Sequence, residues 1–495
     1  MIDFVFALFA ITPMLNDIRN ERLKKLQTLK KRGVDPYPAR VKRTILIGEA
    51  RRGFATLEKS KKAIAIAGRV VGFRDQGKVI FADVRDESGQ IQIVLKKDNL
   101  KNFDLLKSVL DLGDFISVSG SVFKTKKGEE SIEVKYAEIA AKSLRPLPSE
   151  WHGLEDIETR LRKRYLDLLA NPEARELFQK KAIFWDTARN FLKADGFLEV
   201  ETPVFETVPG GADAEPFKTH HNALDTDFYL RISPELPLKK LLVGGFEKVF
   251  EIGRIFRNEG IDKEHLQDYT QLEFYWAYHD YDDLMTLVQK MYQAIVKGVT
   301  GKLTTVCGDK KINWGKQWQK VEYVAAFKKA AKLDPVKASH TELLKKAKAF
   351  GSEPEKSFGR GRLIDLIFKK TVRPTLIQPC FLINPPVDVE PLAKRSEKNL
   401  ALVERVQVVA CGTELGKGFS ELNDPIDQRA RFEEQMKLRA AGDKEAQRLD
   451  EDFLEALEYG MPPAAGFGLS ERLFAVLMDK PVRETVIFPL MRPRK

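Results

Sequence analysis

Residues 250–278 combine cationic, acidic and aromatic side chains at spacings that suit the binding of a nucleoside triphosphate. The segment reads as two β-strands joined by a long charged loop, with Arg257 and Glu259 at the end of the first strand. Alternation along the second strand places Glu273 and Tyr275 on one face. A cation, carboxylates and tyrosines on one side of an antiparallel pair can hold a triphosphate beside a cationic small molecule. Taken alone, the segment is equally compatible with an ordinary hairpin that has a solvated polar face.

A second segment with such chemistry is TELGKGFSELNDPIDQ, residues 413–428. Strand alternation places Lys417, Phe419 and Glu421 on one face. Glu414 falls on the other face unless the neighbouring glycines introduce a β-bulge. The segment therefore offers a cation and one or two carboxylates to the same site.

A third segment, residues 462–493, contains closely spaced glycines followed by a helix pattern. Glycines suit a close approach of the backbone, and the helix carries Arg472 in its first turn and ends before Pro481. An arginine at that position is preorganised to meet phosphate groups. The chain has no GxxxxGK[ST] motif, so a P-loop does not account for phosphate binding.

These segments need a scaffold, and the patterning predicts an α+β chain with three parts. Residues 1–62 form an N-terminal extension with a basic amphipathic helix from Asn16 to Gly33. Residues 63–147 show five short strands with a helix between the third and fourth, which is the layout of an OB-fold barrel. Such barrels bind single-stranded nucleic acid through exposed aromatic and basic side chains, although Phe81 is also compatible with a place in the barrel core.

Residues 148–495 read as helices followed by mainly antiparallel strands, with a lysine-rich helical insertion at about 316–370. A helix that ends near Gly196 precedes the strand pattern FLEVETPVF, which contains Pro203. Because proline cannot donate to a ladder, this strand is predicted at a sheet edge or an interface.

Composition narrows the function classes only slightly. The chain has 83 Lys and Arg against 72 Asp and Glu, a net charge of +11, which suits a polyanionic partner but is also common in proteins that bind none. The three cysteines form no CxxC pair, so we expect neither a zinc site nor disulfides, and a cytoplasmic location. The apolar run at residues 4–15 is too short to cross a membrane, and we expect Met14 to be the native start.

In order, the three segments resemble the three signature motifs of the class II aminoacyl-tRNA synthetases. The resemblance rests on FLEVETPVF, on FRNEG with Arg257 and on GFGLSERL with Arg472. An OB barrel ahead of that domain resembles the subgroup for aspartate, asparagine and lysine. Within it, PGGADAEPFKTHHNALDTDFYLRISPELPLK and ELGKGFSELNDPIDQ look like the lysyl-tRNA synthetases. The resemblance covers the chain from about residue 16 to its end.

That resemblance implies an OB-fold barrel followed by a catalytic domain built on an antiparallel sheet flanked by helices. It implies activation of L-lysine by ATP with Mg²⁺, transfer of lysine to tRNA(Lys), and a homodimer with Pro203 at its interface. Two alternatives remain: a paralogue that delivers lysine to a protein or lipid, and a catalytically silent lysine- or RNA-binding regulator. The barrel weighs against the first, and retention of Arg257, Glu259, Glu414 and Arg472 weighs against the second.

The resemblance also assigns residues to roles. The catalytic residues would be Arg257, Glu259 and Arg472. The substrate lysine would meet Gly211, Glu235, Arg257, Glu273, Tyr275, Lys417 and Glu421. ATP would meet Arg257, Glu259, His265, Tyr269, Glu414 and Arg472. Mg²⁺ would be held by Glu414, with Gln407 a doubtful second ligand. The anticodon would meet Arg74, Phe81, Gln92 and Glu129 of the barrel.

The chain departs from the family pattern at several positions. Lys417 stands where asparagine is usual, and Gln407 stands where a second metal-binding glutamate is usual. The loop of the second motif reads KEHLQDY, which removes an arginine from the phosphate region, and GFGLSER is one residue shorter than the common glycine motif. These positions put the number of metal ions and the contacts of Lys417 in question.

Overall fold

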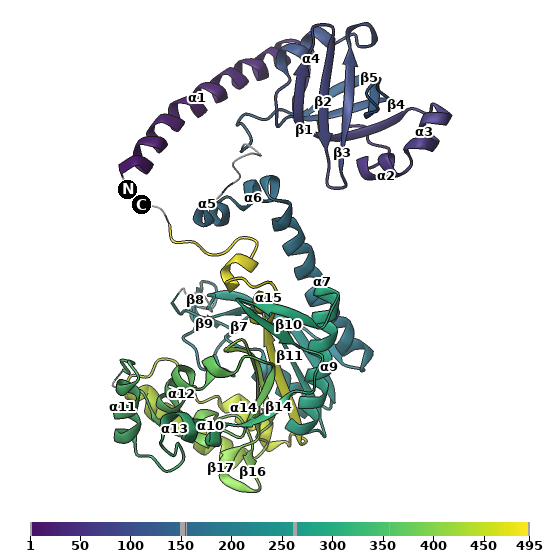
Figure 1. Ribbon diagram of the computed structural model, residues 1–495. Helices are drawn as coiled ribbons and strands as arrows, with labels where there is room; N and C mark the ends of the chain where they lie inside the picture. The colour runs from purple at the N-terminus through teal and green to yellow at the C-terminus, as the bar shows by residue number, and fades with distance from the viewer. Residues whose placement is uncertain (1, 149–153, 155, 261–264, 356, 494–495) are drawn as a thin grey trace. The chain divides into compact units, whose positions relative to one another are not determined.

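The computed structural model describes residues 2–148, 154, 156–260, 265–355 and 357–493. The chain divides into two compact units, Met1–Glu155 and Asp156–Lys495 (Figure 1). Each unit has its own hydrophobic core. The KE residues of the second motif's loop and part of the proline-containing linker after residue 147 lie outside the described residues.

The first unit contains a closed five-stranded barrel with the order β1-β2-β3-β5-β4. Its strands are β1 (Ile64–Asp75), β2 (Val79–Arg85), β3 (Gln90–Lys96), β4 (Phe115–Lys124) and β5 (Glu130–Ala141), and helix α4 (Phe103–Val109) lies between β3 and β4. Alternate residues of β2, such as Ile80, Ala82 and Val84, are buried in the barrel core. The predicted OB-fold layout is confirmed. The helices before it are α1 (Ile2–Lys31), α2 (Ile47–Arg52) and α3 (Phe54–Ser60), so α1 begins before the predicted basic helix.

The second unit is built on an eight-stranded sheet with the order β14-β15-β18-β19-β20-β11-β10-β6. Neighbouring strands are antiparallel except for the pairs β6–β10 and β14–β15. The strands are β6 (Leu198–Glu199), β10 (Lys248–Phe256), β11 (Asp268–Ala277), β14 (Gln319–Glu322), β15 (Cys380–Ile383), β18 (Arg405–Ala410), β19 (Thr413–Ser420) and β20 (Ala464–Ser470). The predicted α+β class with a mainly antiparallel sheet is confirmed.

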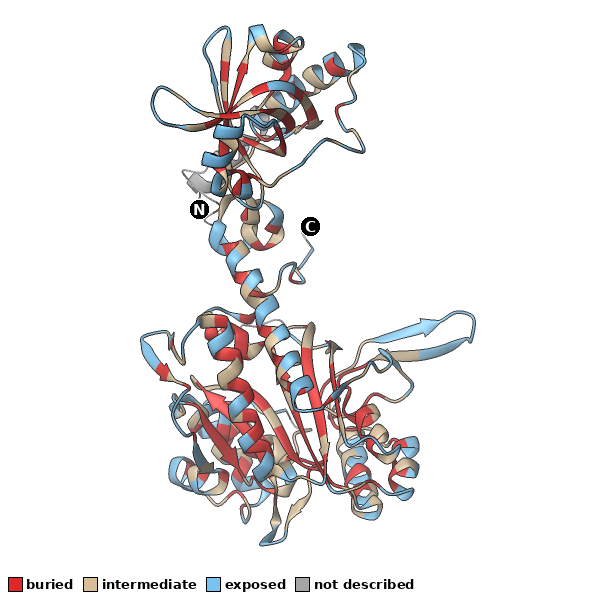
Figure 2. Ribbon diagram, turned by 90° about the vertical axis from the view of Figure 1, so that its right-hand side faces the viewer, coloured by how far each residue is buried: buried red, intermediate tan, exposed pale blue. Residues whose placement is uncertain are grey.

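Helices α7 (Pro172–Ala194) and α9 (Tyr281–Thr300) pack together and cover one face of this sheet. Phe184, Leu192 and Met291 from the helices join Leu272 and Phe274 of β11 in the same core cluster. The sheet strands and the inward sides of these helices are the buried parts of the unit (Figure 2). Because the helices occupy this face, the polar side chains of β11 lie on the opposite face.

The remaining helices of this unit are α5 (Ile157–Arg162), α6 (Arg164–Ala170), α8 (Glu235–Val243), α10 (Tyr323–Ala331), α11 (His340–Ala349), α12 (Arg360–Thr371), α13 (Pro425–Ala440), α14 (Glu451–Glu458) and α15 (Arg472–Leu477). They include α8 and α14, which share a second core cluster with Val249, Tyr275 and Phe419 of the sheet. Three small sheets are formed by β7 (Phe205–Glu206), β8 (Lys218–His221) and β9 (Thr226–Leu230), by β12 (Thr304–Cys307) and β13 (Lys310–Asn313), and by β16 (Arg395–Ser396) and β17 (Asn399–Val403).

Two sequence predictions about this unit were wrong in detail. The expected strand FLEVETPVF consists of β6 and β7, two short strands in different sheets. Between them Thr202 donates its backbone N–H and hydroxyl to Glu251, and Pro203 has no N–H to offer, so ladder pairing stops. The lysine-rich insertion is helical only from α10 onward, because it begins with β14, which pairs with β15 and extends the main sheet.

Candidate active site

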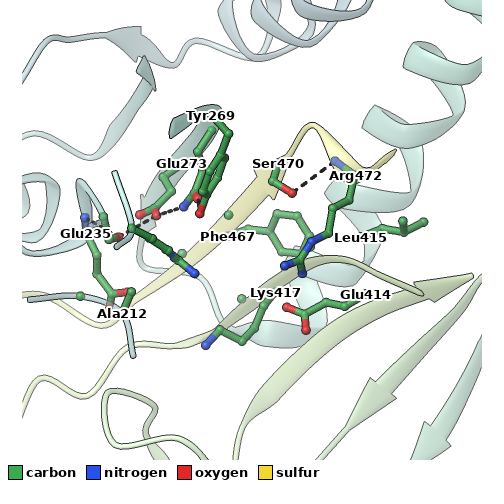
Figure 3. A pocket seen from close by; sticks show the side chains of 18 of the residues that line it. Ala212, Glu235, Tyr269, Glu273, Glu414, Leu415, Lys417, Phe467, Ser470 and Arg472 are labelled. Atoms are coloured by element: carbon green, nitrogen blue, oxygen red, sulfur yellow. Dashed lines mark hydrogen bonds between the residues drawn. The ribbon is translucent and has the colours of Figure 1, made fainter. Parts of the chain in front are cut away.

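A cavity of about 210 Å³ lies on the face of the sheet opposite α7 and α9 (Figure 3). Its walls come from the ends of β10 and β11, from β19 and β20, and from the first turns of α8 and α15. The structure brings to this cavity every residue predicted to contact lysine or ATP: Gly211, Glu235, Arg257, Glu259, His265, Tyr269, Glu273, Tyr275, Glu414, Lys417, Glu421 and Arg472. Segments that lie far apart in the sequence thus form one site.

One end of the cavity is acidic. Glu235, Glu273 and Glu421 are all buried there. Glu273 accepts hydrogen bonds from the hydroxyl groups of Ser233, at 2.8 Å, and Tyr275, at 3.2 Å. Burial and the nearby Glu235 raise the pKa of Glu273 to about 7, and burial raises the pKa of Glu421 well above its ordinary value. Three buried carboxyl groups at one end would be stabilised in their ionised forms by a cationic ligand.

Glycines let this end of the cavity close tightly around its carboxylates. Gly466 of β20 has no side chain where an added Cβ would lie 2.3 Å from the Tyr275 ring and 2.5 Å from Oε1 of Glu421. Gly211 has φ +81°, and a Cβ there would lie 2.8 Å from Cβ of Glu235. A larger residue at either position would therefore displace the groups that line the acidic end.

The other end of the cavity carries two arginines. The Arg257 guanidinium lies 5.6 Å from the Tyr269 ring centre, and its Nε has no hydrogen-bond partner among the described residues. Arg472 begins α15, and its side chain and Glu414 point toward one another (Figure 3). Burial acts to raise the pKa of Glu414, but Arg472 and Lys417 outweigh it, and the pKa lies below its ordinary value. An ionised carboxylate between cations suits an anionic, metal-bearing ligand.

A β-bulge places Glu414 in the cavity. The register between β18 and β19 shifts between Val408 and Val409, which face Gly416 and Glu414, so Leu415 has no residue opposite. The extra residue turns Glu414 onto the face that also carries Lys417. The β-bulge that the sequence allowed but did not require is present, and its extra residue is Leu415, just before Gly416.

Comparison with known proteins agrees with this geometry. A family model for tRNA synthetases class II (D, K and N) matches residues 156–492, and one for an OB-fold nucleic acid binding domain matches residues 64–145. The lysine–tRNA ligase of Roseiflexus castenholzii is 46% identical over 97% of this chain and 100% of its own length. Those of Carboxydothermus hydrogenoformans and Moorella thermoacetica are 46% and 45% identical over 97% of this chain and 99% of their own lengths. The chain belongs to the lysine–tRNA ligase family of class II tRNA synthetases.

Two of the departures from the family pattern lie side by side in the structure. Gln407 and Lys417 face each other across the β18–β19 ladder. The Lys417 ammonium lies 2.8 Å from buried Glu390, which also meets Arg405 at 3.6 Å. Gln407 accepts from Arg405 at 3.5 Å and does not line the cavity, so the structure does not bring the doubtful metal ligand to the site.

Sequence reasoning missed several residues that line or support this synthetase site. Ser233 and Gln271 both donate to Glu273, and Asp213 lines the cavity with a pKa raised to about 6 by burial and Glu390. Gln271 was available from strand alternation, since it lies two residues before Glu273. No comparable signal identifies Lys239, which lies buried beneath Glu235 and Glu421.

Three of the four predicted anticodon residues, Arg74, Phe81 and Glu129, are at least partly exposed on the barrel, and the fourth, Gln92, is buried. Phe81 is not part of the barrel core, and the ladder places it beside Arg74 on β1 and Val94 on β3. Gln92 is buried and accepts a hydrogen bond from Ser131, whereas Glu129 is exposed in the turn before β5. The alternative that Phe81 belongs to the core is therefore wrong.

Two further predictions concern the rest of this synthetase. Pro203 is exposed in the segment between β6 and β7, as an interface residue would be in a single chain. Among the described residues, no helix is long and apolar enough to cross a membrane.

Proposed function

We propose that this chain joins L-lysine to ATP, forming lysyl-adenylate and pyrophosphate, and then transfers the lysyl group to the 3′ end of tRNA(Lys). The observation that carries the proposal is one cavity with three buried carboxyl groups at one end and two arginines at the other. The relatives named lysine–tRNA ligase, aligned over nearly the whole chain, support it. The two ends match the ammonium groups of lysine and the phosphates of ATP.

The chemistry of the first step follows from the charge of the reactants. The lysine carboxylate is already ionised at pH 7, so it attacks the α-phosphorus without a general base. A carboxylate oxygen–phosphorus bond forms, and the bond from phosphorus to the pyrophosphate oxygen breaks. The protein then acts mainly by alignment and by balancing negative charge. We assign Arg257 to the α-phosphate and the lysine carboxylate.

The other ATP contacts follow from position in the cavity. We assign Arg472 and Tyr269 to opposite faces of adenine, with Arg472 also reaching the γ-phosphate. Glu259 accepts from the adenine amino group, and His265 lies near the outer phosphates. In the second step a hydroxyl of the terminal tRNA ribose attacks the lysyl carbonyl carbon, and AMP leaves.

Lysine is recognised at both ends in this proposal. Glu421 and Tyr275 hold the ε-ammonium, while Glu235 and the backbone at Gly211 hold the α-ammonium, with Glu273 between them. A neutral amino acid would leave Glu421 buried without a cation, and such a mismatch gives discrimination on the order of 10⁴. An editing domain is unnecessary at that level of discrimination.

The site fits Mg²⁺ as a partner of ATP. Glu414 is an ionised carboxylate on the cavity wall, and Mg²⁺ is commonly held by one or two carboxylates together with substrate phosphates. Among the described residues, no group of three His, Cys, Asp or Glu side chains could hold a metal without ATP. When bound, Mg²⁺ would neutralise phosphate charge, and Glu414 is the residue we assign to it.

The barrel and the surface complete the proposal. Phe81 stacks an anticodon base, and Arg74, Gln92 and Glu129 contact neighbouring base edges. A homodimer forms around the segment with Pro203, and the cytoplasm is the compartment in which such charging serves translation. These assignments rest on the resemblance and on the outward position of Phe81 beside Arg74.

Lysine-dependent exchange of pyrophosphate into ATP, followed by charging of tRNA(Lys), tests the function. Arginine, ornithine, aspartate and asparagine serve as comparators. Exchange with lysine and charging of tRNA are the expected results. Exchange without charging would favour a non-tRNA acceptor, and absence of exchange by folded protein with Mg²⁺ would refute the activity and leave the silent regulator.

A further inference from the structure

Lys239 of α8 is a fully buried lysine at the acidic end of the cavity. Its Nζ lies 2.6 Å from Oε1 of Glu235 and 2.5 Å from Oε2 of Glu421, and its side chain has no exposed surface. The rings of Phe419 and Phe453 lie 5.2 Å and 6.0 Å from the same ammonium. Both carboxylates line the cavity, whereas Lys239 does not. The ammonium therefore reaches the carboxylates from behind the cavity wall.

This contact uses one oxygen of each carboxylate and leaves the other. Neither oxygen of Glu421 has a hydrogen-bond partner among the described residues, and Oε2 is the one in ion-pair contact with Lys239. Oε1 lies 2.5 Å from the position of a Cβ built on Gly466, which itself lines the cavity. Oε1 is therefore directed toward the cavity while Oε2 is held by Lys239. The lysine fixes the orientation of Glu421 as well as its charge.

The charges at this end balance only when Lys239 is counted. Glu235, Glu273 and Glu421 carry three negative charges when ionised, and Lys239 leaves a net charge of two. A substrate lysine has two ammonium groups, and its carboxylate is matched by Arg257. Without the buried ammonium, the free pocket would carry one more uncompensated carboxylate and would bind one more proton, which the substrate ammonium groups would have to displace.

We propose that Lys239 is a positioning residue for lysine recognition, which favours the ionised forms of Glu235 and Glu421 and turns their free oxygens toward the substrate ammonium groups. This inference rests on the proposed activation of lysine. The other charged or titratable groups that act on Glu235, Glu273 and Glu421 are Tyr275 from β11 and Arg257, with Lys417 and Glu390 acting on Glu235. Each of them stays in place when Lys239 alone is changed.

The test is proton release on lysine binding. The full-length protein is titrated with L-lysine by calorimetry in buffers of different ionisation enthalpy at pH 7. The variants are Lys239→Met, which keeps the side-chain length without the charge, and Lys240→Met as the matched control. Lys240 is the next residue of the same helix and pairs with Asp452 at the surface. Dependence of lysine affinity on pH between 6 and 8 is measured for each.

If Lys239 holds Glu235 and Glu421 in their ionised forms, wild-type protein should release no more than about one proton per lysine bound, from Glu273, whose pKa is raised to about 7. Lys239→Met should bind lysine at least about tenfold more weakly and release about one proton more. Its affinity should also depend more steeply on pH by about one proton. Lys240→Met should match wild type in all three measurements.

Weaker binding by Lys239→Met with an unchanged proton count and pH slope would overturn the proposal, because a purely structural role predicts that outcome. If Lys239→Met does not fold, Lys239→Gln replaces it. Release of two or more protons by the wild-type protein would overturn the proposal without any variant. Absence of both lysine binding and pyrophosphate exchange in wild type would instead refute the proposed function.

Discussion

Gly466 offers a direct test of the packing at the acidic end of the cavity. In Gly466→Ala the new Cβ would lie 2.3 Å from the Tyr275 ring, whereas ordinary contacts begin at 3.4 Å. Tyr275 or β20 must therefore move by about 1 Å, because neighbouring strands leave no free volume. The Tyr275 hydroxyl donates to Glu273 at 3.2 Å, so a shift of that size breaks the hydrogen bond. Overpacking adds a destabilisation of about 1–3 kcal/mol.

The expected effect on substrate follows from the displacement of Tyr275, which is assigned to the ε-ammonium of lysine. Loss of a hydrogen bond between its hydroxyl and that charged group costs about 1.5–3 kcal/mol, which corresponds to about a ten- to hundredfold rise in the KM for lysine. Pyrophosphate exchange at varied lysine measures that rise, and urea unfolding measures stability. Gly468→Ala on the same strand is the matched control for stability, since its Cβ would have no neighbour nearer than 3.4 Å. A lysine KM within twofold of wild type in Gly466→Ala, with stability equal to that of Gly468→Ala, would refute the reasoning.

Three further predictions concern other parts of the chain. The pKa of Glu273 is raised to about 7, so this carboxyl is partly protonated in the free protein. The KM for lysine should therefore fall as pH rises, by about tenfold per pH unit below pH 7, and should level off above it. A KM that does not change with pH would contradict this. Lys417→Asn leaves buried Glu390 with only the longer contact to Arg405 and should lower the free energy of unfolding by about 1–3 kcal/mol, whereas an unchanged urea midpoint would contradict it. Phe81→Ala should raise the KM for tRNA by about five- to a hundredfold through lost stacking, with pyrophosphate exchange unchanged; an equal loss in both assays would show a folding defect instead.

Strand alternation predicted the site well where one face of a strand is covered by helices. On β11, Leu272 and Phe274 pack against α7 and α9, so the residues between them must face the cavity. A one-residue slip would bury Glu273 in that core, and the pattern is therefore strongly specified. On β2 the sequence left a core position open for Phe81, and the structure decides it, because Ile80 and Ala82 belong to the barrel core and Phe81 does not.

Alternation failed where the ladder is irregular. The bulge at Leu415 changes the face of Glu414, and nothing in the period of the surrounding sequence fixes its position. The break between β6 and β7 depends on hydrogen bonds from Thr202 to Glu251, a partner on another strand. Such features are set by tertiary contacts, which local patterns do not contain.

The effect of the residues that depart from the family pattern also depends on tertiary contacts, which the local sequence does not contain. Considered singly, Lys417 is a cation beside the pocket proposed for lysine, where it would compete with the substrate ammonium for Glu421. In the structure its ammonium is held 2.8 Å from Glu390, a carboxylate that is 4% exposed and would otherwise rely on Arg405 at 3.6 Å. Removing a buried carboxylate's nearest cation costs free energy, so Lys417 stabilises the ionised form of Glu390. The Lys417 ammonium pairs with Glu390, and the Lys239 ammonium pairs with Glu421 at the acidic end, so each cation has a carboxylate partner. The charge pairs at this cavity thus join residues that are distant in sequence, which a local pattern cannot predict.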